Sequence, residues 1–346
     1  MMTTEAVIRL SDLRHDQEAE CFAALAKKVP GTTKAGKPFL KCYFRDQRAE
    51  LESPLWADSR FLQQAAGWVV GIAYRLKVKA ELKGQYGLQL QLIDIRPAGE
   101  EDTADGYDFT DLVEPTRYPA GYCLAKIHEL IDGYIDCVKL KAVVRMILAQ
   151  NAELFDKIPA AVSMHHSQPG GLVEHVWSVT RISTLLVKHY ASYYNNLNPP
   201  LSQDVVVAAA VLHDIGKLRE LKHSVFEASY TTEGTLIGHI LIGRDMVRDA
   251  AREVGDVPEE TMLLLEHAIL AHHGKLEFGS PKLPLTIEAL ILSVADDLDA
   301  KVNAVARERL KNSSDLAFTG KIYAVDRAFY KGVPVERPDA EPEDVA

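Results

Sequence analysis

The stretch Ala210–Glu220, "AVLHDIGKLRE", places polar groups at the end of an apolar run. His213 and Asp214 follow directly after the apolar residues, and Gly216 and Lys217 come next. A buried imidazole or carboxylate needs a partner, because an unpaired polar group in a protein core costs several kcal/mol. The stretch therefore predicts either a helix end capped by side chains or a site that holds a ligand.

From residue 120 to about residue 310, the apolar spacing is that of amphipathic helices. The helix that precedes His213 is predicted to begin at Ser202, a residue type that caps helices. A later helix is predicted to begin with a capping box of Asp256 and Glu259 and to stop at Gly274. The helical runs are "CLAKIHELIDGYI", "LKAVVRMILAQNAELF", "GGLVEHVWSVTRISTLLVKHYASYY", "SQDVVVAAAVLHDIG", "DVPEETMLLLEHAILAHHG" and "TIEALILSVADDLDAKVNAVARERL".

The first 98 residues instead alternate between short aliphatic or aromatic runs and turn segments such as "PGTTKAGKP", "DQR" and "KGQ". The candidate strands are "AECFAALAKK", which would also suit a helix, "FLKCYFRD", "AELESPLW", "WVVGIAYRLKVKAEL" and "YGLQLQLIDIRP". A short helical piece, "DSRFLQQAA", precedes the fourth run. Five strands and one helix in roughly 80 residues predict a five-stranded OB-like β-barrel, with an SH3-like barrel as the alternative.

The predicted fold class is therefore multidomain α+β. We expect an OB-like domain at residues 1–98, an acidic linker at 99–119, an all-α helical bundle at 120–332 and a disordered tail at 333–346. The charge pattern favours this division, because residues 26–96 carry 13 Lys/Arg and 6 Asp/Glu, whereas residues 97–119 carry 7 acids and one arginine. Chance variation between two solvated surfaces would give the same contrast.

The four cysteines form no CxxC pair, which indicates reduced thiols. The N-terminal "MMTTEAVIRL" lacks the pattern of a signal peptide, and no apolar run approaches the roughly 18 residues of a membrane span. The net charge of −10 argues against a surface covered with nucleic-acid-binding charge. These observations predict a cytoplasmic protein without a membrane partner.

Histidines and aspartates recur where helices would otherwise bury apolar side chains, and ten of the twelve histidines follow residue 160. The candidates are His175, His213, Asp214, His239, His272, His273 and Asp296. A divalent metal is one common partner for such groups, and imidazole with carboxylate suits Mn, Fe, Co, Ni or Zn. Paired ions that share a carboxylate are a known arrangement for phosphoester chemistry. A lone histidine is more often structural, which is the prediction for His189, His223 and His267.

The order of these residues resembles the HD superfamily of metal-dependent phosphohydrolases, which are helical, and the additional histidines resemble its two-metal branch. The resemblance implies two divalent ions per chain, with manganese expected first and iron, cobalt, nickel or magnesium as alternatives. One ion would bind His175, His213, Asp214 and Asp296, and the second would bind Asp214, His239, His272 and His273. Asp297 and Asp299 match the family pattern less well than Asp296, which follows "SVA".

Longer motifs resemble the YhaM-type 3′-to-5′ exoribonucleases, which couple an N-terminal OB fold to an HD domain. They are "MHHSQPGGLVEH", "VLHDIGKLRE", "YTTEGTLIGHILIG", "ILAHHGKLEFGSPKLPLTIEAL" and "ADDLDAKV". The resemblance implies an exoribonuclease that hydrolyses single-stranded RNA, with single-stranded DNA as a further substrate, by a metal-activated hydroxide. Asp214 would orient the hydroxide and Lys217 would contact phosphate. His166 would contact substrate or assist the leaving group, unless it only caps its loop.

The OB-like domain is expected to bind a single strand through a basic groove with aromatic platforms, where stacking contributes roughly 1–3 kcal/mol per base. The candidate residues are Lys34, Lys37, Phe39, Lys41, Tyr43, Arg45 and Trp56, with Arg48 beside them. Each aromatic residue would also suit the barrel core.

Two other functions stay open at this point. Another HD phosphohydrolase would act on nucleotides or cyclic dinucleotides, although the HH pair is followed by "GKLEFGSP" and not by GYP. A non-catalytic nucleic-acid-binding protein would use its metals structurally, but the complete set of expected ligands argues against it. The sequence does not decide between RNA and DNA, and it leaves the oligomeric state unknown.

Overall fold

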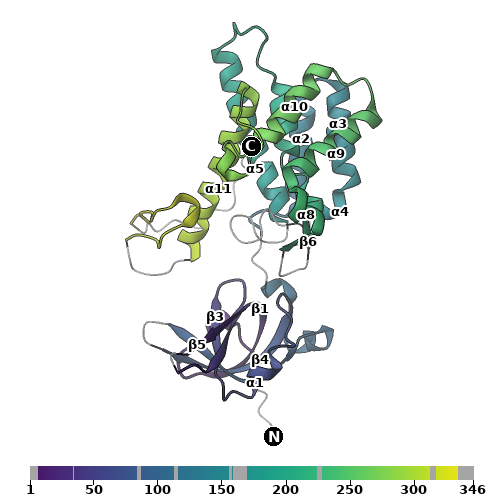
Figure 1. Ribbon diagram of the computed structural model, residues 1–346. Helices are drawn as coiled ribbons and strands as arrows, with labels where there is room; N and C mark the ends of the chain where they lie inside the picture. Colours follow the sequence, from purple (N-terminus) through teal and green to yellow (C-terminus); the bar gives the residue numbers. More distant parts are fainter. Residues whose placement is uncertain are drawn as a thin grey trace.

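The computed structural model describes residues 7–33, 35–83, 87–112, 116–155, 158, 170–223, 228–311 and 317–333. It contains an N-terminal β-barrel and a C-terminal helical domain (Figure 1). The prediction of an OB-like barrel followed by a helical bundle is confirmed. Two predicted site residues, Lys34 and His166, lie outside the described residues.

The barrel is a closed five-stranded sheet with the order β1-β2-β3-β5-β4. The strands are β1 (Glu18–Thr32), β2 (Pro38–Arg45), β3 (Glu50–Leu55), β4 (Ala73–Leu82) and β5 (Leu88–Pro97). Strands β3 and β5 close the barrel in parallel, whereas the other pairs are antiparallel. A short helix, α1 (Phe61–Gln64), lies between β3 and β4, and a 3-10 turn, η1 (Leu10–Asp12), precedes β1. This strand order favours the OB fold over an SH3-like barrel.

Strand β1 belongs to both sides of the barrel. Its first half pairs with β4 and its second half pairs with β2, and the register shifts between Leu25 and Lys27. Such a bulge bends a strand and increases its twist, which lets one long strand wrap around the barrel. Along β2, Cys42 and Phe44 are fully buried in the core, so the alternate residues of that strand face outward. Phe61 from α1 packs against the same core.

The fourth strand is shorter than its sequence predicts. It begins at Ala73 and not at Trp68, because Gly71 takes a left-handed conformation with φ +85° and interrupts the extended run. The ring of Trp68 instead packs against the rings of Phe44 and Tyr74. Trp68, which predicted a longer strand, therefore packs against the barrel core from the loop before β4.

The acidic segment that we predicted as a linker begins with two 3-10 helices, η3 (Glu100–Asp105) and η4 (Phe109–Leu112). Asp102 is 1% exposed and accepts hydrogen bonds from Arg96 at 2.8 Å and from Arg75 at 3.0 Å. Hydrogen bonds from Arg96, and also from Arg75, hold the pKa of Asp102 well below its usual range. The first part of this segment therefore packs onto the barrel and offsets part of its basic charge.

The helical domain is built from α2 (Ala120–Tyr134), α3 (Val138–Gln150), α4 (Ala152–Phe155), α5 (Gly171–Tyr193), α6 (Gln203–Leu212), α7 (Lys217–Glu220), α8 (Thr232–Ile237), α9 (His239–Val254), α10 (Glu259–Ala271) and α11 (Ile287–Lys311). Its small elements are β6 (Leu221–His223), β7 (Ala228–Tyr230), η5 (Leu276–Phe278) and η6 (Tyr323–Val325). Within the described ranges, none of the helices combines the length and the apolar character needed to cross a membrane.

Helix α6 lies at the centre of this domain, in contact with α2, α3, α5, α10 and α11. Every residue of Val205–Leu212 is buried, as expected for a helix that is apolar on all sides. Ser202 caps the helix as predicted, because its hydroxyl oxygen accepts a hydrogen bond from Val205 N at 3.3 Å. The predicted capping box of α10 is wrong, since that helix begins at Glu259 and Asp256 has φ +53°.

Candidate metal centre

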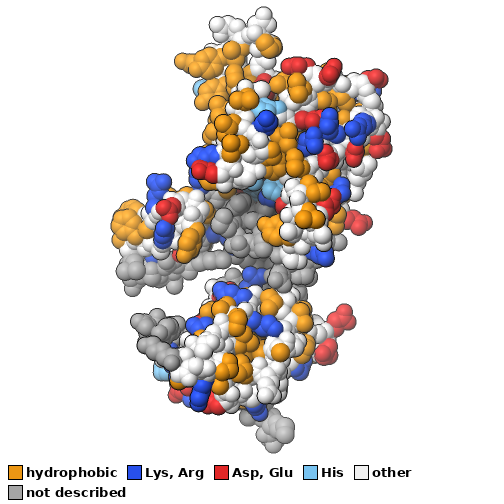
Figure 2. Space-filling model, in the orientation of Figure 1, with side chains coloured by type: hydrophobic (Ala, Val, Ile, Leu, Met, Phe, Trp, Pro, Cys, Tyr) orange, Lys and Arg blue, Asp and Glu red, His pale blue; other side chains and the backbone are white. Residues whose placement is uncertain are grey.

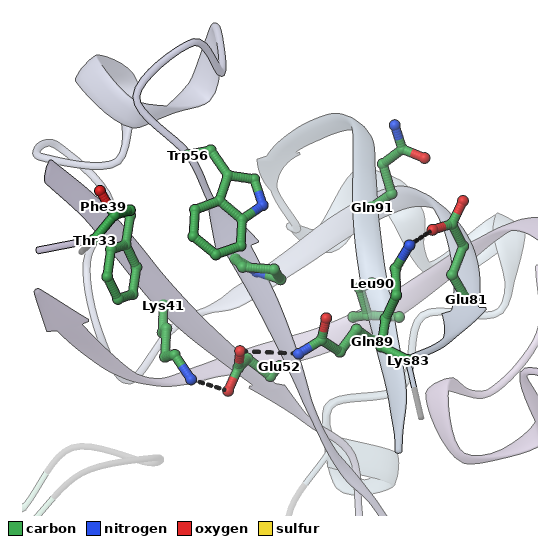
Figure 3. A pocket seen from close by; sticks show the side chains of 11 residues that line it. Thr33, Phe39, Lys41, Glu52, Trp56, Glu81, Lys83, Gln89, Leu90 and Gln91 are labelled. Atoms are coloured by element: carbon green, nitrogen blue, oxygen red, sulfur yellow. Dashed lines mark hydrogen bonds and ion pairs between the residues drawn. The ribbon is translucent and has the colours of Figure 1, made fainter. Parts of the chain in front are cut away.

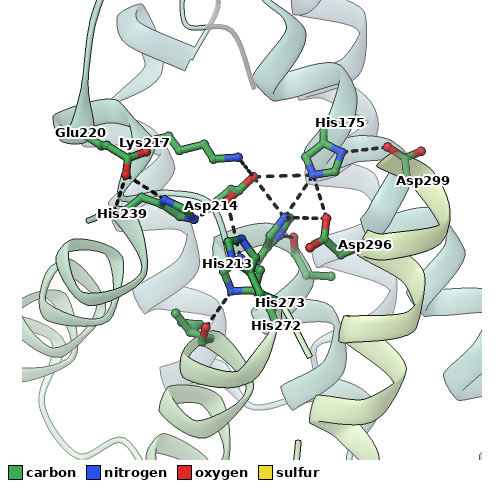
Figure 4. Close-up of polar contacts among 12 residues, drawn as sticks. His175, His213, Asp214, Lys217, Glu220, His239, His272, His273, Asp296 and Asp299 are labelled. Atoms are coloured by element: carbon green, nitrogen blue, oxygen red, sulfur yellow. Dashed lines mark hydrogen bonds and ion pairs between the residues drawn. The ribbon is translucent and has the colours of Figure 1, made fainter. Parts of the chain in front are cut away.

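The seven predicted metal ligands converge in one cluster of the helical domain (Figure 4). His175 lies in α5, His213 and Asp214 follow α6, His239 begins α9, His272 and His273 follow α10, and Asp296 lies in α11. Helices α5, α6, α10 and α11 share one hydrophobic core, so residues far apart in the sequence meet where these helices pack.

The first group of ligands surrounds one oxygen of Asp214. His175 Nε2 lies 3.3 Å from His213 Nε2 and 3.6 Å from Asp214 Oδ2. Asp296 Oδ1 lies 3.2 Å from the same His175 nitrogen. The side chains of His175, His213 and Asp214 are at most 2% exposed. One ion can contact all of these atoms, because ligand bonds of about 2 Å place donor atoms a few ångströms apart.

The second group faces the other oxygen of the same carboxylate. Asp214 Oδ1 lies 3.5 Å from His239 Nε2 and 3.8 Å from His272 Nε2. His239, His272 and His273 each offer a nitrogen within 4.8 Å of the other two. Asp214 therefore presents one oxygen to each group.

All five imidazoles are held by their Nδ1 atoms. The backbone carbonyl acceptors are Ala210 O for His213 (2.8 Å), Ile269 O for His272 (2.7 Å) and Phe278 O for His273 (2.8 Å). The carboxylate acceptors are Asp299 Oδ2 for His175 (2.8 Å) and Glu220 Oε1 for His239 (3.0 Å). A proton on Nδ1 leaves the lone pair of Nε2 for a metal, and such partners are typical of histidines that ligate metals.

Several polar atoms at the centre of the cluster have no hydrogen-bond partner among the described residues. They are Asp214 Oδ1, His239 Nε2 and His272 Nε2, and all three are buried. Three unsatisfied atoms in one place would be costly unless a further group paired with them. Imidazole nitrogen and carboxylate oxygen are ligands of first-row divalent metals. The residues therefore fit a divalent metal.

Burial keeps two of the histidines in the form that binds metals. Burial, with the neighbouring imidazoles of His273 and His213, lowers the pKa of His272 well below its usual value. Burial and the nearby His239 also lower the pKa of His273. Both rings are therefore neutral at neutral pH, and a neutral imidazole is the metal ligand.

The carboxylates have the opposite effect on His175. Burial would lower the pKa of this ring, but Asp296 and Asp299 raise it to about 10. Burial likewise opposes ionisation of Asp214. Its positively charged neighbours, of which Lys217 has the largest effect, nevertheless keep the pKa of Asp214 well below the usual range. The ammonium of Lys217 lies 2.6 Å from Asp214 Oδ2. This half of the cluster attracts cations, and a metal bound at His175 would replace its proton.

Two residues of this site lie outside the predicted ligand set. Glu220 accepts hydrogen bonds from both the backbone N (2.9 Å) and the ring of His239, a role that the sequence pattern does not predict. Asp299, which we set aside as a ligand, is buried and orients His175, with a further hydrogen bond from Ser178. Its position three residues after Asp296 places both carboxylates on one face of α11, which is the signal that could have found it.

The predicted nucleic-acid residues of the barrel that the structure describes lie on its outer surface. On β2, Phe39, Lys41, Tyr43 and Arg45 alternate with the core residues and share one face. Phe39 and Trp56 lie side by side with ring centroids 5.2 Å apart, and Trp56 is 49% exposed. These aromatic residues are therefore not barrel core.

A groove of about 1000 Å³ runs past the Phe39–Trp56 pair (Figure 3). Lys41 pairs with Glu52 at 3.0 Å within it, and Lys83 pairs with Glu81. Glu52 thus neutralises Lys41, which the sequence suggested as part of a basic lining. Tyr43 donates a hydrogen bond to Glu52 at 2.9 Å beside the groove, and Lys37 is exposed just before β2.

Comparison with known proteins agrees with this architecture. The HD domain family matches residues 172–301. The 3′-5′ exoribonuclease YhaM of Bacillus licheniformis is 34% identical over 92% of this chain and 96% of that protein. The chain belongs to the YhaM family of 3′-5′ exoribonucleases. The YhaM of Bacillus subtilis is 32% identical to this YhaM-family chain, over 91% of the chain and 95% of the relative.

Among solved structures, the second OB-fold domain of replication protein A from Methanococcus maripaludis covers 27% of this chain and 96% of that domain, with 17% identity and a TM-score of 0.21. A similarity at that TM-score is too low to support an argument. The assignment of the OB fold in this YhaM-family chain therefore rests on strand order and parallel closure.

The role of Asp299 as an orienting residue can be tested by replacing its carboxylate. Asp299→Asn is expected to weaken Mn²⁺ binding by about 10- to 100-fold, because the ring of His175 loses its charged partner. Calorimetric titration of Mn²⁺ measures the change. The matched control is Asp297→Asn, since Asp297 is half-exposed and pairs with Lys301 outside the cluster. Equal Mn²⁺ affinity in the two variants would contradict the assignment.

Proposed function

We propose that the chain is a metal-dependent 3′-5′ exoribonuclease that shortens single-stranded RNA by hydrolysing phosphodiester bonds. The observation that carries the proposal is the position of Asp214 between two groups of buried or partly buried imidazoles, where several buried polar atoms have no hydrogen-bond partner among the described residues. Membership of the YhaM family supports the same activity. Single-stranded DNA is the second polymer that such a site would accept.

The first ion is proposed to bind His175, His213, Asp214 and Asp296, and the second Asp214, His239, His272 and His273. Manganese is the first candidate for this donor set, with iron, cobalt, nickel or magnesium as alternatives. Bound divalent ions would lower the pKa of a water molecule and neutralise negative charge on the phosphate.

The chain itself would position the reacting groups. Asp214 would keep the two groups of ligands at a fixed separation, because every residue of α6 from Val205 to Leu212 is buried and the helix is held in place up to His213. With a cation on Asp214, the ammonium of Lys217 would be available to bind a phosphate oxygen. His166 is proposed, from the family motif alone, to assist departure of the 3′-oxygen.

The barrel is proposed to hold the strand that the helical domain shortens. Phe39 and Trp56 would stack on bases, since each presents part of a ring to the groove. Gly31 leaves room for the ring of Phe39 in this arrangement, because a Cβ at residue 31 would lie only 2.3 Å from that ring. Lys34, Lys37, Lys41, Tyr43 and Arg45 would contact the backbone.

The experiment that tests the function supplies purified protein and Mn²⁺ with end-labelled single-stranded RNA, the matched DNA, nucleotides and a cyclic dinucleotide. Stepwise shortening of RNA from its 3′ end is the expected result. Hydrolysis confined to the small molecules would instead favour a nucleotide or cyclic-dinucleotide phosphodiesterase. Metal binding without any hydrolysis would favour a nucleic-acid-binding protein with structural metals.

Removing the exposed indole tests the groove. Trp56→Ala is expected to weaken binding of a single-stranded RNA by roughly 5- to 100-fold, which corresponds to the loss of one stacked base. Fluorescence anisotropy of a labelled strand measures the affinity. Val69→Ala is the control, because Val69 is 56% exposed and does not line the groove. An unchanged affinity in Trp56→Ala would exclude the groove as the main site.

A further inference from the structure

The segment that follows α11 forms a small hairpin, which we call the C-terminal hairpin (residues 317–333). Its strands are joined by antiparallel bridges between Phe318 and Tyr330 and between Ile322 and Arg327. The turn η6 (Tyr323–Val325) forms its tip. Arg309 of α11 donates a hydrogen bond to the carbonyl of Lys331, which ties the hairpin to that helix.

The C-terminal hairpin exposes three aromatic rings. Phe318 and Tyr330 form a cross-strand pair with ring centroids 5.6 Å apart, yet they are 54% and 56% exposed. Tyr323 at the tip is 86% exposed. Gly320 and Ala328, each two residues from a member of the pair, are too small to cover the rings. Such exposed rings are typical of binding surfaces.

Cationic side chains accompany these rings. The C-terminal hairpin carries three Lys/Arg and one Asp/Glu, although the whole chain has a net charge of −10. Figure 2 shows hydrophobic and Lys/Arg side chains next to one another over this segment, at the lower left of the helical domain. Lys321 pairs with Asp326, but both are exposed and such a pair is weak. Exposed aromatic rings among positive charges are what proteins use to bind single-stranded nucleic acid.

The position of the C-terminal hairpin relates it to the metal centre. It follows the helix that carries Asp296 and Asp299, and the axial distance from Asp299 to Lys311 is about 18 Å at 1.5 Å per residue. That distance corresponds to about five nucleotides at roughly 3.4 Å per nucleotide of stacked strand. A strand whose 3′ end lies in the metal centre could therefore reach the hairpin with nucleotides further from that end.

We propose that the C-terminal hairpin is a second contact for the substrate strand, separate from the barrel groove. Bases would stack on the Phe318–Tyr330 pair and on Tyr323, while Lys321 and Arg327 would bind phosphates. The proposal rests on the proposed function, because it takes the bound strand to be the one that the metal centre shortens. Its consequence is that affinity depends on strand length.

The test compares Tyr323→Ala and the double variant Tyr323→Ala/Tyr330→Ala with their parent, all carrying Asp214→Asn to prevent hydrolysis. Affinities for labelled RNA strands of three and twenty nucleotides are measured by anisotropy. We expect the affinity for the long strand to fall about tenfold for each aromatic residue removed, and that for the short strand to stay unchanged. Tyr193→Ala, at a 70% exposed site on α5, is the matched control.

The outcomes separate this proposal from the proposed function. Equal affinity of parent and variants for the long strand overturns the hairpin contact, as does an equal loss for both strand lengths. The single variant Tyr323→Ala removes a ring without disturbing packing, so it decides the matter if the double variant is unstable. Absence of RNA hydrolysis by the wild-type chain would refute the exoribonuclease, whereas the hairpin proposal depends only on the binding differences.

Arg327→Gln should reduce the salt dependence of RNA binding. The slope of the logarithm of the binding constant against the logarithm of salt concentration is expected to be smaller by about 0.7.

Discussion

Asp214→Asn is expected to abolish RNA hydrolysis, with a fall in kcat on the order of 10⁴-fold. The reason is geometric, because Asp214 presents one oxygen to each group of imidazoles. An asparagine carries no charge and offers only one oxygen, so it cannot serve both groups. Because the neighbouring rings carry their proton on Nδ1, the amide hydrogens of the asparagine would point at the Nε2 lone pairs that a metal needs.

The measurement combines hydrolysis of a labelled single strand with the metal content of the purified protein. Wild-type protein is expected to retain two divalent ions per chain, to lose activity on treatment with a chelator and to recover it with Mn²⁺. The variant should hold fewer ions and show no recovery. Asp297→Asn, on the exposed side of the same helix that carries Asp296, should behave as wild type. A fully active Asp214→Asn protein would remove the bridging assignment.

The sequence could predict the candidate ligands because each is a chemically distinctive residue at a position that would otherwise be apolar. The residues that orient them were harder to predict. Glu220 contacts His239 only because α7 and α9 pack together, and a glutamate at the end of a short helix has no distinctive pattern. Three of the five Nδ1 partners are backbone carbonyls, which a sequence does not distinguish.

The surface of the barrel shows a similar limit. A period of two predicts that Phe39, Lys41 and Tyr43 share a face, but it does not say whether that face is inside or outside. The neighbouring strand decides how much charge the face carries. Tyr43 is opposite Glu52 in the β2–β3 register, and the same glutamate neutralises Lys41. Strand register is a long-range property, so the loss of positive charge could not be predicted locally.

Gly216 is a glycine whose role depends on its neighbours in space. A glycine that follows a helix commonly permits a left-handed turn, but Gly216 has an ordinary right-handed conformation with φ −65°. Its role is close approach, because a Cβ at Gly216 would lie 2.0 Å from the carbonyl oxygen of His239 and 2.6 Å from the amide nitrogen of Gly243. The absence of a side chain therefore brings α7 against the start of α9.

Gly216→Ala is expected to destabilise the helical domain by about 1–3 kcal/mol or more and to lower kcat by roughly 10²-fold. Both obstructing atoms are backbone, so the clash can be relieved only by moving the start of α9. That movement carries His239 away from Asp214, and the second group of ligands loses one member. Metal analysis should therefore show that the ion bound by His239, His272 and His273 is lost first.

The matched control is Gly121→Ala in α2, where an added Cβ would meet nothing within 4 Å. This change should leave metal content unchanged and, because alanine favours helix, should not lower the free energy of unfolding. Denaturant unfolding and Mn²⁺ titration of the two variants separate loss of fold from loss of metal. If Gly216→Ala keeps wild-type Mn²⁺ stoichiometry and activity, then α7 and α9 tolerate separation, and close packing at Gly216 does not position His239.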